Sequence, residues 1–198
     1  MQNLETFWNW FKVNEPELRS LRSPSEPLWD LALDRLHDVD ERLWIEMSRP
    51  YDGIRDFIVT AQGNPEAFDI AEALVAAAPE MPAWQIIALK PGMGFDFKSD
   101  YAGLSLDSRE MWFLPLENPG CPGLLGLRIG IPGLEPQPAE DVLDAVLMML
   151  DTGLGERTAA TEIRHVEVST LPPNPESLGY IELPELPEYL RWRARKVN

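Results

Sequence analysis

The stretch that decides the fold is IRDFIVTAQGNPEAFDIAEALVAAAPEMPAWQIIALKP, residues 54–91. It begins with a β-branched and aromatic run, which is typical of a strand. Gly63-Asn64-Pro65 then supplies a turn, an N-cap and a first helical residue, and apolar residues follow at helical spacing. A second β-branched run at 84–89 predicts another strand. This part of the chain is therefore predicted to fold as strand, capped helix and strand.

The same order of elements occurs a second time. Residues 43–53 predict a strand and, at Asp52-Gly53, a hairpin turn that leads into the stretch above. Farther along, residues 109–169 predict two strands, a helix over 139–151 and a last strand. We therefore expect an α+β fold of two β-β-α-β units, at 43–91 and 109–169. Their strands are expected to form one mixed, mainly antiparallel sheet with the helices on one face.

Helices are also predicted outside these units. The first of two N-terminal helices, over residues 3–13, has an apolar stripe that predicts a buried face, and Pro16 is expected to follow its end. The second begins after Ser25, a predicted N-cap. Residues 170–198 form an extension that ends in a short basic helix. Because 198 residues are enough for one substantial core, we expect a single α+β domain. The apolar stripe of the first helix consists of Leu4, Phe7, Trp8 and Phe11.

The charge balance limits the choice of partner. The chain has 33 acidic and 17 basic residues, so its net charge is −16. A surface of this sign repels phosphate backbones and anionic lipid headgroups, so neither nucleic acid nor a membrane is expected as a partner. A basic protein partner fits better. The plainer interpretation, that the charge only keeps a soluble protein dispersed, stays open, and the oligomeric state is not predicted.

Cysteine usage and hydropathy indicate the compartment. Cys121 is the only cysteine, so the chain has no internal disulfide and no paired-cysteine metal site. No secretory signal and no apolar run long enough for a transmembrane helix are found. A cytoplasmic protein is therefore expected. Gly63 lacks the spaced glycines of a dinucleotide loop and the lysine of a phosphate loop, so no cofactor is expected.

One predicted helix face has a pattern that could bind metal. A histidine and three carboxylates recur there at i, i+3, i+4 and i+7, which places them on one side of a helix. A complete site would need ligands from a second element, and His165, the other histidine, lies in a predicted strand. The alternative is a solvated face whose acids pair with Arg35 and Arg42. The candidate ligands are Asp34, His37, Asp38 and Glu41.

Residues 91–108 are polar, contain several glycines and have room for one short edge strand. A flexible loop of this length that carries Met and Phe is a candidate partner-binding site. Its carboxylates could also act as general acid and base if burial raised their pKa, although a solvated loop is the alternative. The candidate partner-binding residues are Met93, Phe95, Asp96, Phe97, Asp100 and Tyr101.

Several segments carry a resemblance. They are FWNWF at 7–11, IVTAQG at 58–63, LVAAAP at 74–79 and LGE at 154–156. Together, over most of residues 7–160, they resemble a family of uncharacterised bacterial cytoplasmic proteins. The resemblance implies no activity, cofactor or catalytic residues. Proteins of this sort sometimes accompany toxin systems as immunity partners.

These observations favour a non-enzymatic protein over an enzyme. No nucleophile, phosphate-binding or metal pattern of useful specificity is present. We therefore expect a protein that binds another protein through an acidic surface or the 91–108 loop, and an immunity-like role is one form of this expectation. Two alternatives stay open: a metal-assisted hydrolase that uses the helix face or the loop carboxylates, and a small-ligand binder with a pocket between sheet and helices.

Overall fold

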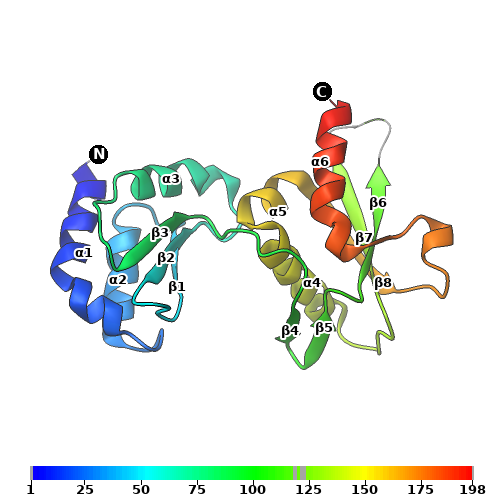
Figure 1. Ribbon diagram of the computed structural model, residues 1–198, viewed down its shortest axis with the longest axis horizontal. Helices are drawn as coiled ribbons and strands as arrows, with labels where there is room; N and C mark the ends of the chain where they lie inside the picture. The colour runs from blue at the N-terminus through cyan, green and yellow to red at the C-terminus, as the bar shows by residue number, and fades with distance from the viewer. Residues whose placement is uncertain (1, 118–119, 121–123, 198) are drawn as a thin grey trace. The chain divides into compact units, whose positions relative to one another are not determined.

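The computed structural model describes residues 2–117, 120 and 124–197. The chain divides into two compact units, Met1–Lys90 and Pro91–Asn198 (Figure 1). The boundary falls at the end of the first predicted β-β-α-β unit. Cys121 lies outside the described residues, as do most of residues 117–123, for which we expect a turn between the first two strands of the second β-β-α-β unit.

The first unit contains a three-stranded sheet in the order β1-β2-β3. β1 runs antiparallel to β2, and β3 runs parallel to it. The two N-terminal helices precede the strands as predicted, and Figure 1 shows them grouped with α3 around the sheet. The elements are α1 (Gln2–Ser20), α2 (Pro27–His37), β1 (Trp44–Met47), β2 (Arg55–Thr60), the 3-10 turn η1 (Pro65–Ala67), α3 (Phe68–Ala76) and β3 (Trp84–Ala88).

The second unit contains a separate hairpin, β4–β5, and a four-stranded sheet in the order β8-β7-β6-β9. β6 is antiparallel to β7, and β8 is parallel to β7. The elements are β4 (Lys98–Tyr101), β5 (Leu104–Asp107), β6 (Trp112–Glu117), β7 (Leu125–Ile131), α4 (Ala139–Leu154), α5 (Glu156–Glu162), β8 (Ile163–Thr170), η2 (Glu176–Leu178), β9 (Ile181–Glu182), η3 (Leu183–Glu185) and α6 (Leu186–Val197).

The predicted α+β class and the repeated β-β-α-β order are confirmed. Both units have an antiparallel hairpin followed by a crossover helix and a parallel strand. The expected single sheet is corrected, because the strands of each unit pair only among themselves. Each sheet is covered by helices of its own unit, so each buries its own apolar face and no common sheet is needed.

The core of the first unit is aromatic. Phe57, at the centre of β2, is fully buried, and its ring centroid lies 4.9 Å from that of Phe11. Trp84 of β3 stacks edge-on against Phe11 at 5.1 Å. The indole N–H of Trp8 donates to the carbonyl oxygen of Leu74 in α3 at 2.8 Å. The apolar stripe of α1 is therefore the core face, as its spacing predicted.

Helix α1 is longer than its sequence predicted. Pro16 lies inside it, and the helix continues to Ser20. Leu18 is fully buried, and the Glu15 carboxylate accepts a hydrogen bond from the Trp84 indole at 3.0 Å. These tertiary contacts stabilise the last turns and outweigh the main-chain hydrogen bond that proline cannot make.

The predicted N-cap of α2 is also corrected. Glu26, and not Ser25, occupies the N-cap position, and its side chain does not cap the helix. Its carboxylate instead accepts hydrogen bonds from the backbone N–H groups of Arg22 at 2.6 Å and Ser23 at 2.9 Å. The glutamate therefore organises the turn that precedes the helix.

Two local turn predictions are confirmed. Tyr51 and Ile54 exchange main-chain hydrogen bonds of 2.8 and 3.0 Å across Asp52-Gly53, both of which have positive φ. This is the geometry for which Asp-Gly is favoured. The Asn64 side chain accepts from the N–H of Glu66 at 3.1 Å, as expected of an N-cap.

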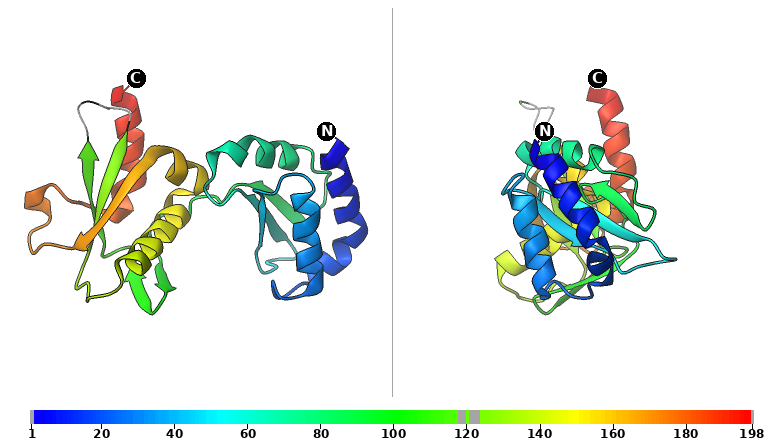
Figure 2. Two further views of the ribbon diagram at one scale, coloured as in Figure 1. Left: turned by 180° about the vertical axis from the view of Figure 1, so that it is seen from behind. Right: turned by 90° about the vertical axis from the view of Figure 1, so that its left-hand side faces the viewer.

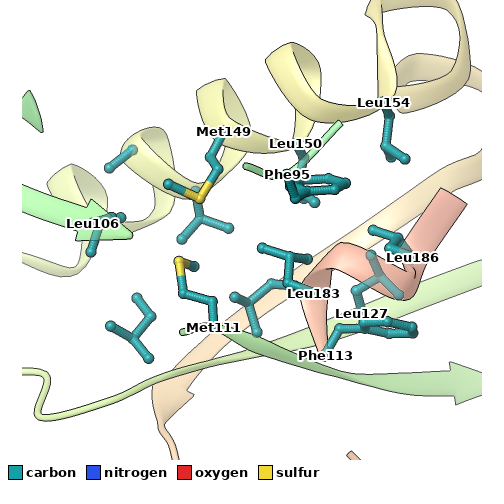
Figure 3. Close-up of a cluster of buried hydrophobic side chains, with 14 of the residues drawn as sticks. Phe95, Leu106, Met111, Phe113, Leu127, Met149, Leu150, Leu154, Leu183 and Leu186 are labelled. Carbon is teal, nitrogen blue, oxygen red and sulfur yellow. The ribbon is translucent and has the colours of Figure 1, made fainter. Parts of the chain in front are cut away.

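The core of the second unit lies between α4 and the four-stranded sheet (Figure 3). Met149 and Leu150 of α4 face Phe113 of β6 and Leu127 of β7, which are fully buried. The segment that leads into α6 adds Leu183 and Leu186 to the same cluster. The C-terminal extension therefore completes this core.

A substitution at Phe57 tests the assigned core of the first unit. We predict that Phe57→Ala lowers the free energy of unfolding by about 3–5 kcal/mol, because the cavity it leaves is enclosed by other rings. Urea unfolding followed by circular dichroism measures this. Tyr51→Ala, an aromatic deletion at an exposed site of the same unit, should change stability by less than about 0.5 kcal/mol. Equal effects of the two substitutions would contradict the assigned core.

Candidate functional site

The predicted metal ligands on α2 do not assemble into a site. Among the described residues, no group of three or more His, Cys, Asp or Glu side chains could hold a metal ion. Nε2 of His37 lies 3.1 Å from the carbonyl oxygen of Leu43, and Asp38 pairs with Arg35 at 3.2 Å. α2 ends at His37, so Asp38 and Glu41 lie in the turn after it, and the expected single helix face of Asp34, His37, Asp38 and Glu41 is corrected.

Of the two arginines expected to pair with these acids, Arg35 does so and Arg42 has another partner. Arg42 pairs with Asp40 at 2.6 Å. Hydrogen bonds from the Arg42 guanidinium lower the pKa of Asp40 to about 2. Asp40 lies outside the predicted ligand set, so Arg42 stabilises the turn after α2 and does not neutralise the candidate ligands.

The predicted partner-binding loop is anchored and partly buried, so it differs from the flexible loop expected. The N–H groups of Met93 and Gly94 donate to the carbonyl oxygens of Thr152 and Gly153, near the C-terminal end of α4, each at 3.0 Å. Phe95 is only 4% exposed. Its ring packs directly against Gly153, where a larger residue would clash with it. The segment therefore provides hydrogen-bond donors to the carbonyl groups near the helix end.

The rest of this loop forms the β4–β5 hairpin in place of one edge strand. Phe97 and Tyr101 pack against the core of the second unit. Met93, Asp96 and Asp100 remain exposed. Of the six predicted partner-binding residues, half are therefore committed to packing, and the other half do not form a described cavity.

A groove that the sequence did not reveal lies between β8 and α4, and we call it the β8 groove. Its larger part, with a volume of 490 Å³, is lined by Val142 and Leu143 of α4 and by Val166 and Val168 of β8. A smaller part of 160 Å³ continues past Val166 to the start of β8. The groove therefore follows the length of the strand, which Figure 2 shows in orange beside α4.

Among the described residues, no strand pairs with the outer edge of β8. β8 is the end strand of its sheet. The N–H of Leu171, directly after β8, donates to the carbonyl oxygen of Ile131 in β7 at 2.9 Å. Since main-chain groups alternate in direction along a strand, the N–H and C=O groups of Val166, Val168 and Thr170 point to the open edge. The same three residues line the groove.

The helix beside the groove is acidic. α4 contains four carboxylates and no basic residue. Glu140 is three positions before Leu143, which lines the larger part, and Asp144 is three positions before Leu147, which lines the smaller part, so each carboxylate neighbours a lining residue on the helix surface. Glu135 lines the groove directly. None of these three carboxylates forms an ion pair within the described residues, whereas Arg164 lines the opposite end.

Comparisons with known proteins add no assignment: no family model, curated protein or solved structure matches this chain. The resemblance of its segments to uncharacterised bacterial proteins stays a prediction. No described helix combines the length and apolar content that crossing a membrane requires.

Hydrogen exchange tests the geometry of this edge. We predict that the amides of Val166, Val168 and Thr170 exchange at least about tenfold faster than those of Glu167 and Ser169, which face β7. Residue-resolved NMR exchange measures all five within one strand, so local sequence context serves as the internal control. Uniform protection along β8 would show that its outer edge is covered.

Proposed function

We propose that this protein is a non-enzymatic binding protein and that the β8 groove holds an extended, basic segment of another protein. The observation that supports this most directly is the open edge of β8 beside an apolar groove. An added strand would bond to the outward main-chain groups, and its alternate side chains would enter the groove. β8 has eight residues, which is enough for an ordinary strand pairing.

The charge of the groove favours a basic occupant. The carboxylate of Glu135 lines the wider part, Glu140 neighbours Leu143 there, and Asp144 neighbours Leu147 in the smaller part. None of the three forms an ion pair within the described residues, and a lysine or arginine near the end of the incoming strand would be attracted to the wider part. A second copy of this chain is disfavoured as occupant, because each copy carries a net charge of −16. The preferred ligand is therefore a strand with alternate apolar residues and a basic residue at the end that meets the wider part of the groove.

Model peptides test this proposal without a known partner. We predict that a peptide of alternating valine and threonine between lysine pairs binds at least about tenfold more tightly than its counterpart with glutamate pairs. Fluorescence anisotropy of labelled peptides at low salt measures both, and the difference should shrink as salt is added. Glu140→Lys should weaken the lysine peptide, whereas Glu176→Lys, at an exposed site outside the groove, should not. Equal binding of both peptides would contradict the proposal.

A proline tests the strand pairing itself. Val168→Pro removes an outward N–H without removing a bond to β7, and proline is tolerated where a strand N–H faces solvent. We predict that it weakens binding of the lysine peptide about five- to tenfold, because one main-chain hydrogen bond is lost and the edge is obstructed. Val168→Thr keeps the N–H and should bind within about twofold of the wild type. If the two variants bind equally well, the ligand does not pair with β8.

A further inference from the structure

A second cavity, in the first unit, is lined by arginines. It has a volume of 650 Å³ and lies among the turn after α1, the start of α2 and the connection from β1 to β2. Trp29 forms part of its wall, and no lining residue is acidic. Four of the 17 basic residues of a strongly acidic chain meet at this cavity. They are Arg19, Arg22, Arg49 and Arg55, and we call the cavity the arginine pocket.

Arg55 is the buried member of this group, with only 5% of its surface exposed. Its Nε donates to the carbonyl oxygen of Ser48 at 2.7 Å. Its Nη1 donates to the carbonyl oxygens of Leu18 at 3.0 Å and Leu21 at 2.8 Å, near the C-terminal end of α1. All its partners are neutral, and burial lowers the pKa of Arg55, although a guanidinium still keeps its charge.

One part of the Arg55 guanidinium stays available. Nη2 of Arg55 donates to no described residue. It is also not fully buried, so it keeps some access to solvent. Because Arg55 is part of the pocket wall, this nitrogen can reach a ligand from the pocket. The same side chain holds the end of α1 and the residue before Arg49, so it also fixes the backbone that carries the other three arginines.

The other three arginines are exposed and have no acidic partner. Within the described chain, none of Arg19, Arg22 and Arg49 lies within ion-pair distance of a carboxylate. This differs from much of the remaining surface, where arginines are paired with aspartate or glutamate at 2.6–3.2 Å. The arginines that are paired in this way are Arg35, Arg42, Arg109 and Arg128.

The charges of the pocket arginines act on the carboxylate of Glu26. Hydrogen bonds from the backbone N–H groups of Arg22 and Ser23 lower the pKa of Glu26, and the charges of Arg22 and Arg55 lower it further. The positive field of the arginines is therefore felt by a carboxylate that belongs to the protein. One glutamate offsets at most one of the four guanidinium charges.

We propose that the arginine pocket binds a small ligand through a multivalent phosphate group. Planar guanidinium groups match phosphate oxygens with paired hydrogen bonds, and several of them together favour an anion with more than one charge. The volume is that of a small-molecule site, and Trp29 offers an apolar surface to the rest of the ligand. This site shares no residue with the β8 groove, so the two proposals can fail separately.

Calorimetric titration with inorganic pyrophosphate at low salt tests the proposal. The wild type should bind pyrophosphate, and Arg49→Gln should weaken binding about tenfold because a charge-assisted contact is lost. Arg35→Gln removes the same charge from an exposed site of the same unit and should change affinity by less than about twofold. These arginines are exposed, so neither variant is expected to disturb folding. In NMR spectra, the signal of the Trp29 indole N–H should shift when pyrophosphate binds.

The outcomes separate the sources of the anion. Tighter binding of pyrophosphate than of citrate, with the expected difference between the two variants, supports a phosphate site. Tighter binding of citrate would overturn the phosphate assignment in favour of a carboxylate ligand. Equal loss in Arg49→Gln and Arg35→Gln would show only a diffuse charge effect, and absence of pyrophosphate binding to the wild type would also overturn the proposal.

Discussion

The parallel pairing of β7 with β8 is the constraint on which the candidate binding site depends. Two parallel neighbours cannot be joined by a tight turn, so the chain between them must cross over the sheet. Here α4 and α5 form that crossover, and the chain returns to lay β8 at the edge. One connection therefore produces both walls of the groove, a helix face and an unpaired strand edge.

The same constraint acts in the first unit, where α3 connects the parallel strands β2 and β3. The features beyond this shared pattern set the units apart. In the first, Arg55 joins the end of α1 to the hairpin connection, and arginines collect around it. In the second, the acidic helix α4 borders an apolar groove. The two proposed binding surfaces therefore differ in charge, and each belongs to one unit.

The sequence predicted the elements whose signals are local. Asn64 capped its helix and Asp52-Gly53 formed its hairpin, because both depend on neighbouring backbone groups alone. Helix α1 continued past Pro16 because Leu18 is buried and because Arg55 and Trp84, far along the chain, donate hydrogen bonds to its last turns, which no local rule contains. The β4–β5 hairpin was missed because its turn places Ala102, a residue with no preference for positive φ, at φ 49°.

Neither binding site could be read from residue spacing. The four arginines of the arginine pocket come from three separate segments and meet only when α1, β1 and β2 are in place. The open edge of β8 depends on strand order, which the pattern of residues 163–170 does not encode. The candidates that the sequence did suggest were clusters of residues close together along the chain. The structure uses Phe95 for packing and leaves His37 bonded to the backbone.

The most direct test of a strand-binding edge is amide exchange in the presence of the lysine-flanked valine–threonine peptide. A strand that adds to β8 slows exchange at Val166, Val168 and Thr170 and leaves Glu167 and Ser169 unchanged, since these already bond to β7. Saturating peptide that protects none of the three outward amides, or that protects another acidic face such as that of α2, would contradict binding in the β8 groove.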